Sequence, residues 1–156
     1  LEFINQNFRH NFYGFYNKIT YENDSLQPRQ IDENISLTRF ANLLAFYSDK
    51  KRFNNISKHG LRYLSIPEIA TARIEEAGVL IIDREMQTPP LTININGSMN
   101  NHLVIEFINI AHKQEGWYKL IRLNESENVS ASIEIDGFKS KSVVTPKALG
   151  ELLLTH

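Results

Sequence analysis

The sequence predicts an α+β chain in which an αα-hairpin layer, residues 1–88, precedes a small α/β layer, residues 89–156. Two segments before position 65 carry apolar residues at helical spacing, whereas apolar and polar residues alternate just after position 90. Pro89-Pro90 separates the two patterns, because neither residue can donate a backbone hydrogen bond and both restrict φ. We expect the two layers to share one core.

The first 31 residues are rich in aromatic and polar side chains. Their alternation around Phe12 to Ile19 predicts a short β-hairpin. We interpret the aromatic side chains as the cover of one edge of a helical core, and a sugar-stacking surface is the alternative.

A long helix is predicted over Asp32–Tyr47. Its apolar residues cover a face about 200° wide, which predicts neighbours on more than one side; they are Leu37, Phe40, Ala41, Leu43, Leu44 and Tyr47. Arg39 and Asn42 occupy the narrow opposite side. Asp32 or Asn34 is suited to cap its N-terminus.

A second helix, predicted over Lys51–Leu64, completes an αα-hairpin. Its apolar stripe contains Phe53, Ile56, Gly60, Tyr63 and Leu64. Pro67 is suited to the first turn of a further short helix. The residues alone leave positions 77–86 open between a strand and a buried helix.

The pattern of residues 89–156 predicts the element order β-α-β-β-β-α. This order is typical of a reduced thioredoxin-like fold or of a similar small α/β layer. The first two strands are expected to be parallel. Asp136-Gly137 indicates a hairpin turn, and Thr145-Pro146 indicates an N-cap followed by an N1 proline. The elements are strand 91–96, helix 101–113, strands 117–123, 131–135 and 139–144, and a helix after Thr145.

Composition excludes several classes of function. The formal net charge of −1 over 156 residues argues against nucleic-acid binding. The absence of cysteine removes disulfides, thiolate catalysis and cysteine zinc sites, and the five histidines show no metal-ligand spacing. No apolar run is long enough to span a bilayer. We therefore expect a soluble protein with no cofactor, no metal, no nucleic acid and no membrane partner; the compartment is open, with the cytoplasm favoured.

Two candidate sites follow from the residues. The polar cluster Arg29, Asp32, Glu33, Asn34 and Arg39 places carboxylates beside arginines, as sugar or acid–base chemistry requires; the alternative is a helix cap with an ion pair. The second candidate is the turn at Gly97 and Ser98, whose backbone N–H groups precede a helix and can hold an anion.

The pattern DENIxxxRFANLLAxY, starting at Asp32, resembles the late helical hairpin of YyaL-like proteins, which contain a thioredoxin domain and are related to the spermatogenesis-associated family. The resemblance covers residues 12–154. Further matches are Arg52-Phe53, Gly60–Leu64, Pro67–Ala70, Ala77–Leu80 with Asp83 and Glu85, residues 90–93 and Thr145–Leu149.

The resemblance implies an architecture. Family members join an N-terminal thioredoxin-like domain to an α/α toroid similar to six-hairpin glycosidases and N-acylglucosamine epimerases. This chain would be the C-terminal end of such a protein, and residues 77–86 would be helical. The start at Leu1, without Met or a signal-like segment, agrees with a fragment or a processed product. Many relatives carry a cysteine pair near the last hairpin, where residues 134–140 contain none.

Three hypotheses of function result. The first is a non-catalytic C-terminal segment whose partner is the remainder of the full-length chain, its toroid and thioredoxin-like domain. The second is a fragment of a sugar epimerase-like or glycosidase-like enzyme, whose acidic helix start lines a cavity that takes a carbohydrate. The third is a cysteine-less thioredoxin-like interaction module.

Overall fold

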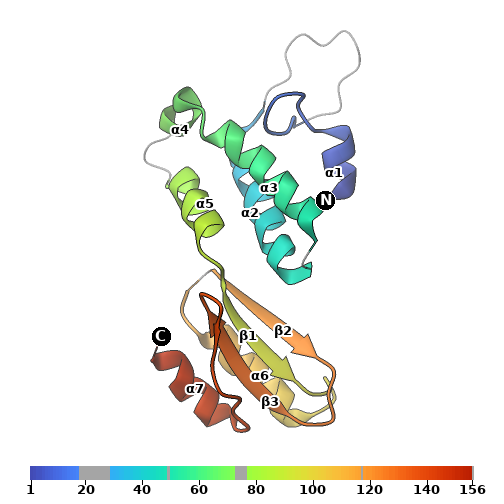
Figure 1. Cartoon of the computed structure of the whole chain (residues 1–156), viewed down its shortest axis with the longest axis vertical. Helices are drawn as coiled ribbons and strands as arrows, with labels where there is room; N and C mark the ends of the chain where they lie inside the picture. The colour runs from blue at the N-terminus through green and yellow to red at the C-terminus, as the bar shows by residue number, and fades with distance from the viewer. Residues whose placement is uncertain (18–28, 49, 73–76, 117, 156) are drawn as a thin grey trace. The chain divides into compact units, whose positions relative to one another are not determined.

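The computed structural model describes residues 1–17, 29–48, 50–72, 77–116 and 118–155 (Figure 1). The fold is mixed α+β, and the chain divides into two compact units, residues 1–88 and 89–156. Each unit has its own clusters of buried hydrophobic residues. The single core expected from the sequence is therefore wrong. No helix within the described ranges has the length and apolar character needed to cross a bilayer.

The first unit is helical among the residues that the structure describes. Helices α2 and α3 form the predicted αα-hairpin, and α5 packs against α2 (Figure 1). Residues 78–87 are helical, as the family resemblance implies. The helices are α1 (Glu2–Asn7), α2 (Ile31–Ser48), α3 (Lys51–Leu64), α4 (Pro67–Ala72) and α5 (Gly78–Gln87).

The hairpin expected around positions 12–19 is reduced, in its described part, to a single antiparallel bridge between Arg9 and Phe15. Residues 18 and 19 lie outside the described ranges. The aromatic side chains of this segment include both buried and exposed ones. Phe15 is buried in a cluster with Ala41 and Phe53, whereas Phe12 is exposed.

Helix α3 buries the apolar stripe that its sequence predicts. Phe53, Ile56, Tyr63 and Leu64 are all buried. Gly60 lies on the same face, where a Cβ atom would overlap the hydroxyl of Thr38 on α2. The missing side chain therefore lets the two helix backbones approach closely.

The predicted buried face of α2 is wrong in part, although Ala41 is buried and Leu37 and Leu44 pack against the same cluster. Its fully buried positions are Asn34, Thr38, Ala41 and Asn42, whereas Phe40 and Tyr47 are 55% and 58% exposed. The apolar face of this helix is so broad that helical periodicity alone cannot select the part of it that packs. Contacts with Gly60 of α3 and with the polar groups described below select it.

The capping prediction for α2 is also wrong. Asp32 and Asn34 both lie within the helix, which begins at Ile31. The backbone N–H of Asn34 donates to Gln30 O at 3.1 Å, so the first turn already includes these residues. Asp32 and Glu33 occupy that first turn, where their negative charge suits the helix dipole.

The second unit is a four-stranded sheet with strand order β2-β1-β3-β4 (Figure 1). β1 and β2 are parallel, as predicted, and β3 is antiparallel to β1. The elements are β1 (Leu91–Asn96), α6 (His102–Lys113), β2 (Lys119–Asn124), β3 (Ser130–Ile135), β4 (Phe138–Lys139) and α7 (Pro146–Leu154). The core joins residues of α6 and α7 to one face of the sheet; its largest buried members are Ile93, Ile95, Phe107, Ile133 and Leu149.

Two local sequence signals in this unit are confirmed. The side chain of Thr145 accepts a hydrogen bond from Ala148 N at the start of α7, as an N-cap does. Asn101, which the sequence placed inside a helix, is instead the N-cap of α6 and accepts from Leu103 N. Asp136 and Gly137 both have positive φ, 50° and 82°, as a two-residue hairpin turn of type I′ requires.

The strand predicted over residues 139–144 is wrong in length. β4 contains two residues, and Val143 forms only an isolated bridge with Ala131. The hydroxyl of Ser140 accepts the hydrogen bond of Ile133 N at 3.0 Å. A side chain thus replaces a backbone carbonyl, and the regular ladder ends there.

Candidate functional site

Asn34, a member of the predicted polar cluster, joins the N-terminal segment to α2. Its Oδ1 accepts from Phe15 N at 2.7 Å, and its Nδ2 donates to Phe15 O at 2.9 Å and to Gln30 O at 2.8 Å. The residue is 1% exposed. Its amide therefore satisfies buried backbone groups.

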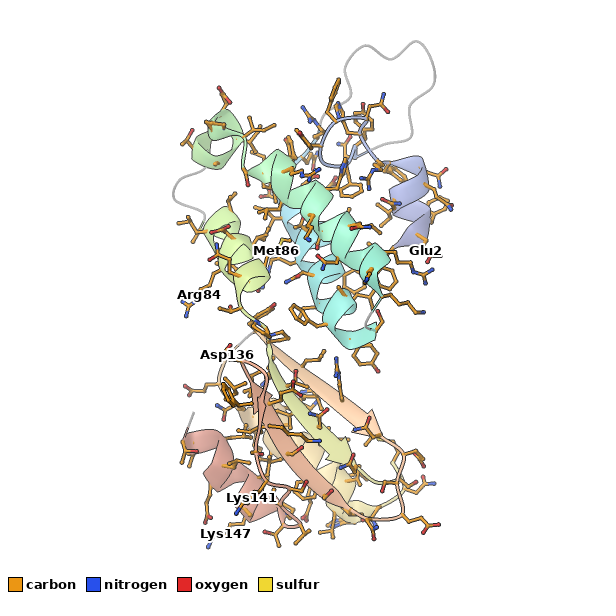
Figure 2. All side chains as sticks on the ribbon, viewed as in Figure 1. Glu2, Arg84, Met86, Asp136, Lys141 and Lys147 are labelled. Atoms are coloured by element: carbon orange, nitrogen blue, oxygen red, sulfur yellow. The ribbon has the colours of Figure 1, made fainter. Side chains whose placement is uncertain are left out.

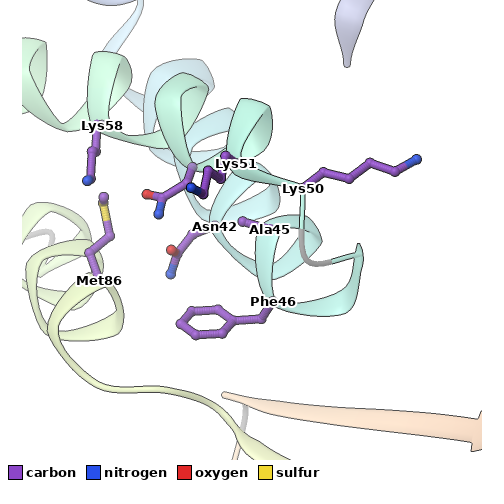
Figure 3. A pocket seen from close by; sticks show the side chains of 8 residues that line it. Asn42, Ala45, Phe46, Lys50, Lys51, Lys58 and Met86 are labelled. Atoms are coloured by element: carbon purple, nitrogen blue, oxygen red, sulfur yellow. The ribbon is translucent and has the colours of Figure 1, made fainter.

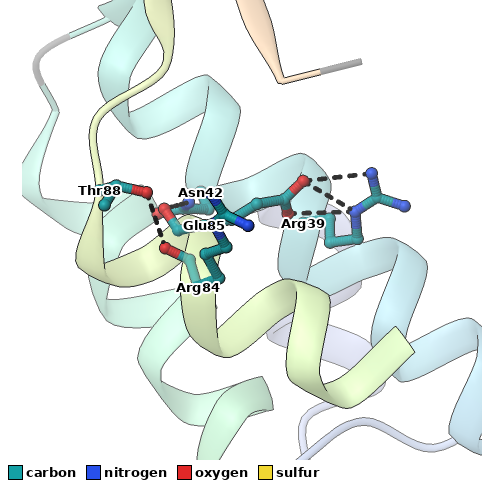
Figure 4. Close-up of polar contacts among 5 residues, drawn as sticks. All are labelled: Arg39, Asn42, Arg84, Glu85 and Thr88. Carbon is teal, nitrogen blue, oxygen red and sulfur yellow. Dashed lines mark hydrogen bonds and ion pairs between the residues drawn. The ribbon is translucent and has the colours of Figure 1, made fainter. Parts of the chain in front are cut away.

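Arg39 forms an ion pair with Glu85 of α5 (Figure 4). Its Nε lies 3.1 Å from Glu85 Oε2 and its Nη2 lies 3.2 Å from Oε1, which is a bidentate arrangement. Glu85 is only 3% exposed, and Asn42 Nδ2 donates to its backbone carbonyl at 3.0 Å. These contacts hold α5 against α2.

Arg29 lies over the ring of Tyr63, with 4.5 Å between its guanidinium carbon and the ring centroid. It also donates to Tyr13 O at 3.0 Å, and the Tyr63 hydroxyl donates to Arg29 O at 2.8 Å. Burial raises the pKa of Tyr63, and the charge of Arg29 opposes that shift. The phenol is therefore a hydrogen-bond donor at neutral pH.

The two acidic members of the cluster are exposed at the start of α2. Glu33 borders a mostly apolar hollow of about 260 Å³, whose other walls are Ile4, Phe8, Phe15, Tyr16, Asn17, Asn34 and Leu37. Neither Asp32 nor Arg39 borders it. Of the five predicted residues, only Glu33 and Asn34 border this hollow, so the cluster as a whole does not line one cavity.

At the second candidate site, the N–H of Gly97 already donates to Asn124 O at 2.9 Å. Ser98 borders a shallow hollow that also contains Glu125 and Glu127. Two carboxylates beside this turn raise the cost of placing an anion there. The geometry gives an anion site at Gly97 and Ser98 no support.

The sequence prediction missed a polar centre around His59. Its Nε2 lies 3.0 Å from Gly14 O, and its Nδ1 lies 2.9 Å from Arg9 Nη2. Because a carbonyl can only accept and a guanidinium can only donate, the ring is neutral with its proton on Nε2. Burial and then the charge of Arg9 lower the pKa of His59.

The prediction also missed a basic hollow of about 370 Å³ bordered by α2, α3 and α5 (Figure 3). The signal that could have found the hollow is the spacing of Lys51, Asn54 and Lys58, which places all three on one face of α3. The lining consists of these residues with Asn42, Ala45, Phe46, Lys50 and Met86.

No group of three or more His, Cys, Asp or Glu side chains suited to a metal ion occurs among the residues that the structure describes. No protein-family model, curated protein or solved structure matches the chain.

Proposed function

We propose that this chain is a non-catalytic C-terminal segment of a YyaL-like, thioredoxin-domain-containing protein and that its αα-hairpin closes an α/α toroid. The observation that carries the proposal is the exposed aromatic pair on α2. Phe40 and Tyr47 are seven residues apart, so they lie on one stripe of the helix. Two large exposed aromatic side chains on one stripe suit a further packing partner.

The other sides of α2 already have partners. Ala41 and Thr38 face α3, and Arg39 and Asn42 bind α5. In a toroid of helical hairpins, each hairpin also packs against the next one. The stripe of Phe40 and Tyr47 is the side of α2 on which such a neighbour would pack.

Two further observations support the proposal. The structural roles of Asn34 and Arg39 agree with a non-catalytic segment, because each of them joins α2 to another part of the first unit. The order β-α-β followed by β-β-α in the second unit agrees with a small thioredoxin-like layer.

Photo-crosslinking tests this proposal. Benzoylphenylalanine placed at Phe40 of the longer protein is expected to crosslink within the same polypeptide, to a helix that precedes this segment. The matched control places the same residue at Phe138, which is exposed in the second unit. Mass spectrometry identifies the linked peptides, and absence of any intramolecular product at position 40 would contradict the proposal.

A sugar-active enzyme fragment is the second candidate, favoured by Glu33 at the edge of an aromatic hollow. One carboxylate falls short of the pair that glycoside hydrolysis normally uses. Titration with N-acetylglucosamine, monitored by amide resonances, tests this candidate. If the sugar binds, it should shift the amide resonances of Phe8 and Phe15. Glu33→Gln should abolish these shifts, while Asp32→Asn should not. An unshifted spectrum of the original chain would exclude binding of this sugar.

The interaction-module hypothesis gains no support at the sheet edge formed by residues 139–144. Addition of a strand requires an open row of backbone groups at a sheet edge. β4 offers only two residues, and the Ser140 hydroxyl interrupts the ladder beside it.

A further inference from the structure

We propose that the basic hollow of the first unit binds a small phosphomonoester that carries an apolar or aromatic group. This inference does not depend on the toroid assignment, because every residue that borders the hollow belongs to the first unit.

The cations of α3 divide by location. Those outside the hollow have partners: Arg52 forms an ion pair with Glu2, and Arg62 lies 5.9 Å from the centroid of the Tyr13 ring. Lys51 and Lys58 border the hollow, and within the described ranges no carboxylate forms an ion pair with either of them. α3 itself contains no Asp or Glu. An uncompensated cluster of this kind favours an anionic ligand.

The spacing of the helix places these cations on one face of α3. Lys51, Asn54 and Lys58 follow each other at intervals of three and four residues, with Asn54 between the lysines. The long side chains of the two lysines can converge over the Asn54 amide. Figure 3 shows Lys58 directed towards Met86 and Lys50 directed away from the other labelled residues. Lys51 and Lys58 are therefore the principal cationic ligands in this proposal.

Charge selects a phosphomonoester over a carboxylate. Its second pKa is about 6, so it carries nearly two negative charges at pH 7 and offers three strong acceptor oxygens. Lysine binds such a group as a point charge, while the Asn54 amide can donate a hydrogen bond. Two ammonium groups match a dianion better than a monoanion.

The apolar side chains of the hollow indicate what the ligand carries besides its phosphate group. The hollow of about 370 Å³ is larger than a phosphate group needs, and its remaining lining includes Ala45, Phe46 and Met86. These apolar side chains suit a ring or a short aliphatic group. The hollow is bordered by three helices and the chain has a net charge of −1, which disfavours an extended polyanion such as nucleic acid.

The test is a titration of the ¹⁵N-labelled 156-residue chain with phenyl phosphate, inorganic phosphate and phenol. Phenyl phosphate should shift the Asn54 and Lys58 amide resonances saturably, more tightly than inorganic phosphate, and phenol should have no effect. Lys51→Gln and Lys58→Gln should each weaken phenyl phosphate binding about tenfold, the amount expected for one charge-assisted contact. Lys58→Arg should retain binding, because the charge remains.

Lys141→Gln is the matched control, since it removes one exposed positive charge in the second unit (Figure 2). It should leave binding unchanged, and Met86→Ala should weaken phenyl phosphate without affecting inorganic phosphate. We expect phenyl phosphate to bind with a dissociation constant on the order of 0.1 mM. Absence of saturation by 10 mM phenyl phosphate would therefore overturn the proposal. Equal weakening by Lys141→Gln would do so too, as would a 20-nucleotide RNA that binds the same residues more tightly than phenyl phosphate.

Discussion

Helices α2 and α3 pack against each other but contribute opposite kinds of surface. α3 buries apolar side chains such as Phe53 and presents lysine and arginine to solvent. α2 buries Asn34 and Thr38 and presents Phe40 to solvent. The comparison shows that apolar burial dominates the packing of α3, whereas in α2 hydrogen bonds and a close backbone contact add to the packing of Ala41 and Leu44.

The largest expected difference lies between two phenylalanines. Phe53→Ala removes a ring that is 7% exposed and should lower the free energy of unfolding of the first unit by about 3–5 kcal/mol. Phe40→Ala, in the isolated chain, should change it by less than about 0.5 kcal/mol, because the ring lies largely in solvent. Urea denaturation measures the free energy of unfolding of both variants, and hydrogen exchange of the α3 amides assigns the change to the first unit. Similar losses for the two variants would contradict the opposite roles of the helices.

Asn34→Ala should have the next largest effect, roughly 2–3 kcal/mol. The substitution leaves the backbone N–H and C=O of Phe15 without their partner in a buried environment. Asn55→Ala on the exposed face of α3 is the matched control and should be nearly neutral. The same denaturation experiment compares them, and equal stability of the two variants would show that the amide of Asn34 does not position α2.

Gly60→Ala should cost about 1–2 kcal/mol, because overlap with the Thr38 hydroxyl outweighs the higher helix propensity of alanine. Adding Thr38→Ala should recover most of this loss, since it removes the overlapping atom. Gly150→Ala on α7, where a Cβ atom would meet nothing within 4 Å, should stabilise the second unit by up to about 1 kcal/mol. A double variant no more stable than Gly60→Ala alone would exclude the proposed close contact.

The smallest expected effect is a dependence on pH through His59. Its pKa is lowered in the folded chain, so below pH 6.5, near its ordinary pKa, the unfolded chain binds a proton that the folded chain does not. Stability of the first unit should therefore fall as the pH decreases from about 6.5 to the folded-state pKa. His10, whose pKa is lowered by partial burial and by Arg29, contributes with the same sign.

Urea midpoints between pH 7.5 and 5 measure this dependence. His59→Gln should make the decrease less steep, because the side chain no longer titrates, while the share of His10 remains. An unchanged slope in this variant would show that protonation of His59 does not destabilise the fold.

The same comparison explains how much could be predicted from the sequence. In α3, one apolar stripe opposes a polar face, so the period defines both the helix and its buried side. The Thr145 cap and the Asp136-Gly137 turn were equally predictable, because caps and tight turns depend on neighbouring residues.

Other features depend on residues distant in sequence. The buried side of α2 follows from Gly60 and Glu85, and the short β4 follows from the contact between Ser140 and Ile133. The pairing of Arg39 with Glu85 joins residues 46 positions apart. Periodicity could not find such partners, so the predicted polar cluster grouped residues by sequence proximity alone.

The amide of Asn34 also has a consequence for measuring docking of the N-terminal segment. Because it binds both backbone groups of Phe15, it acts as the neighbouring strand that this residue otherwise lacks on that side. The amide proton of Phe15 can exchange with deuterium only when the Asn34 side chain separates from it. Its exchange rate is thus a single-residue reporter of the opening between the N-terminal segment and α2.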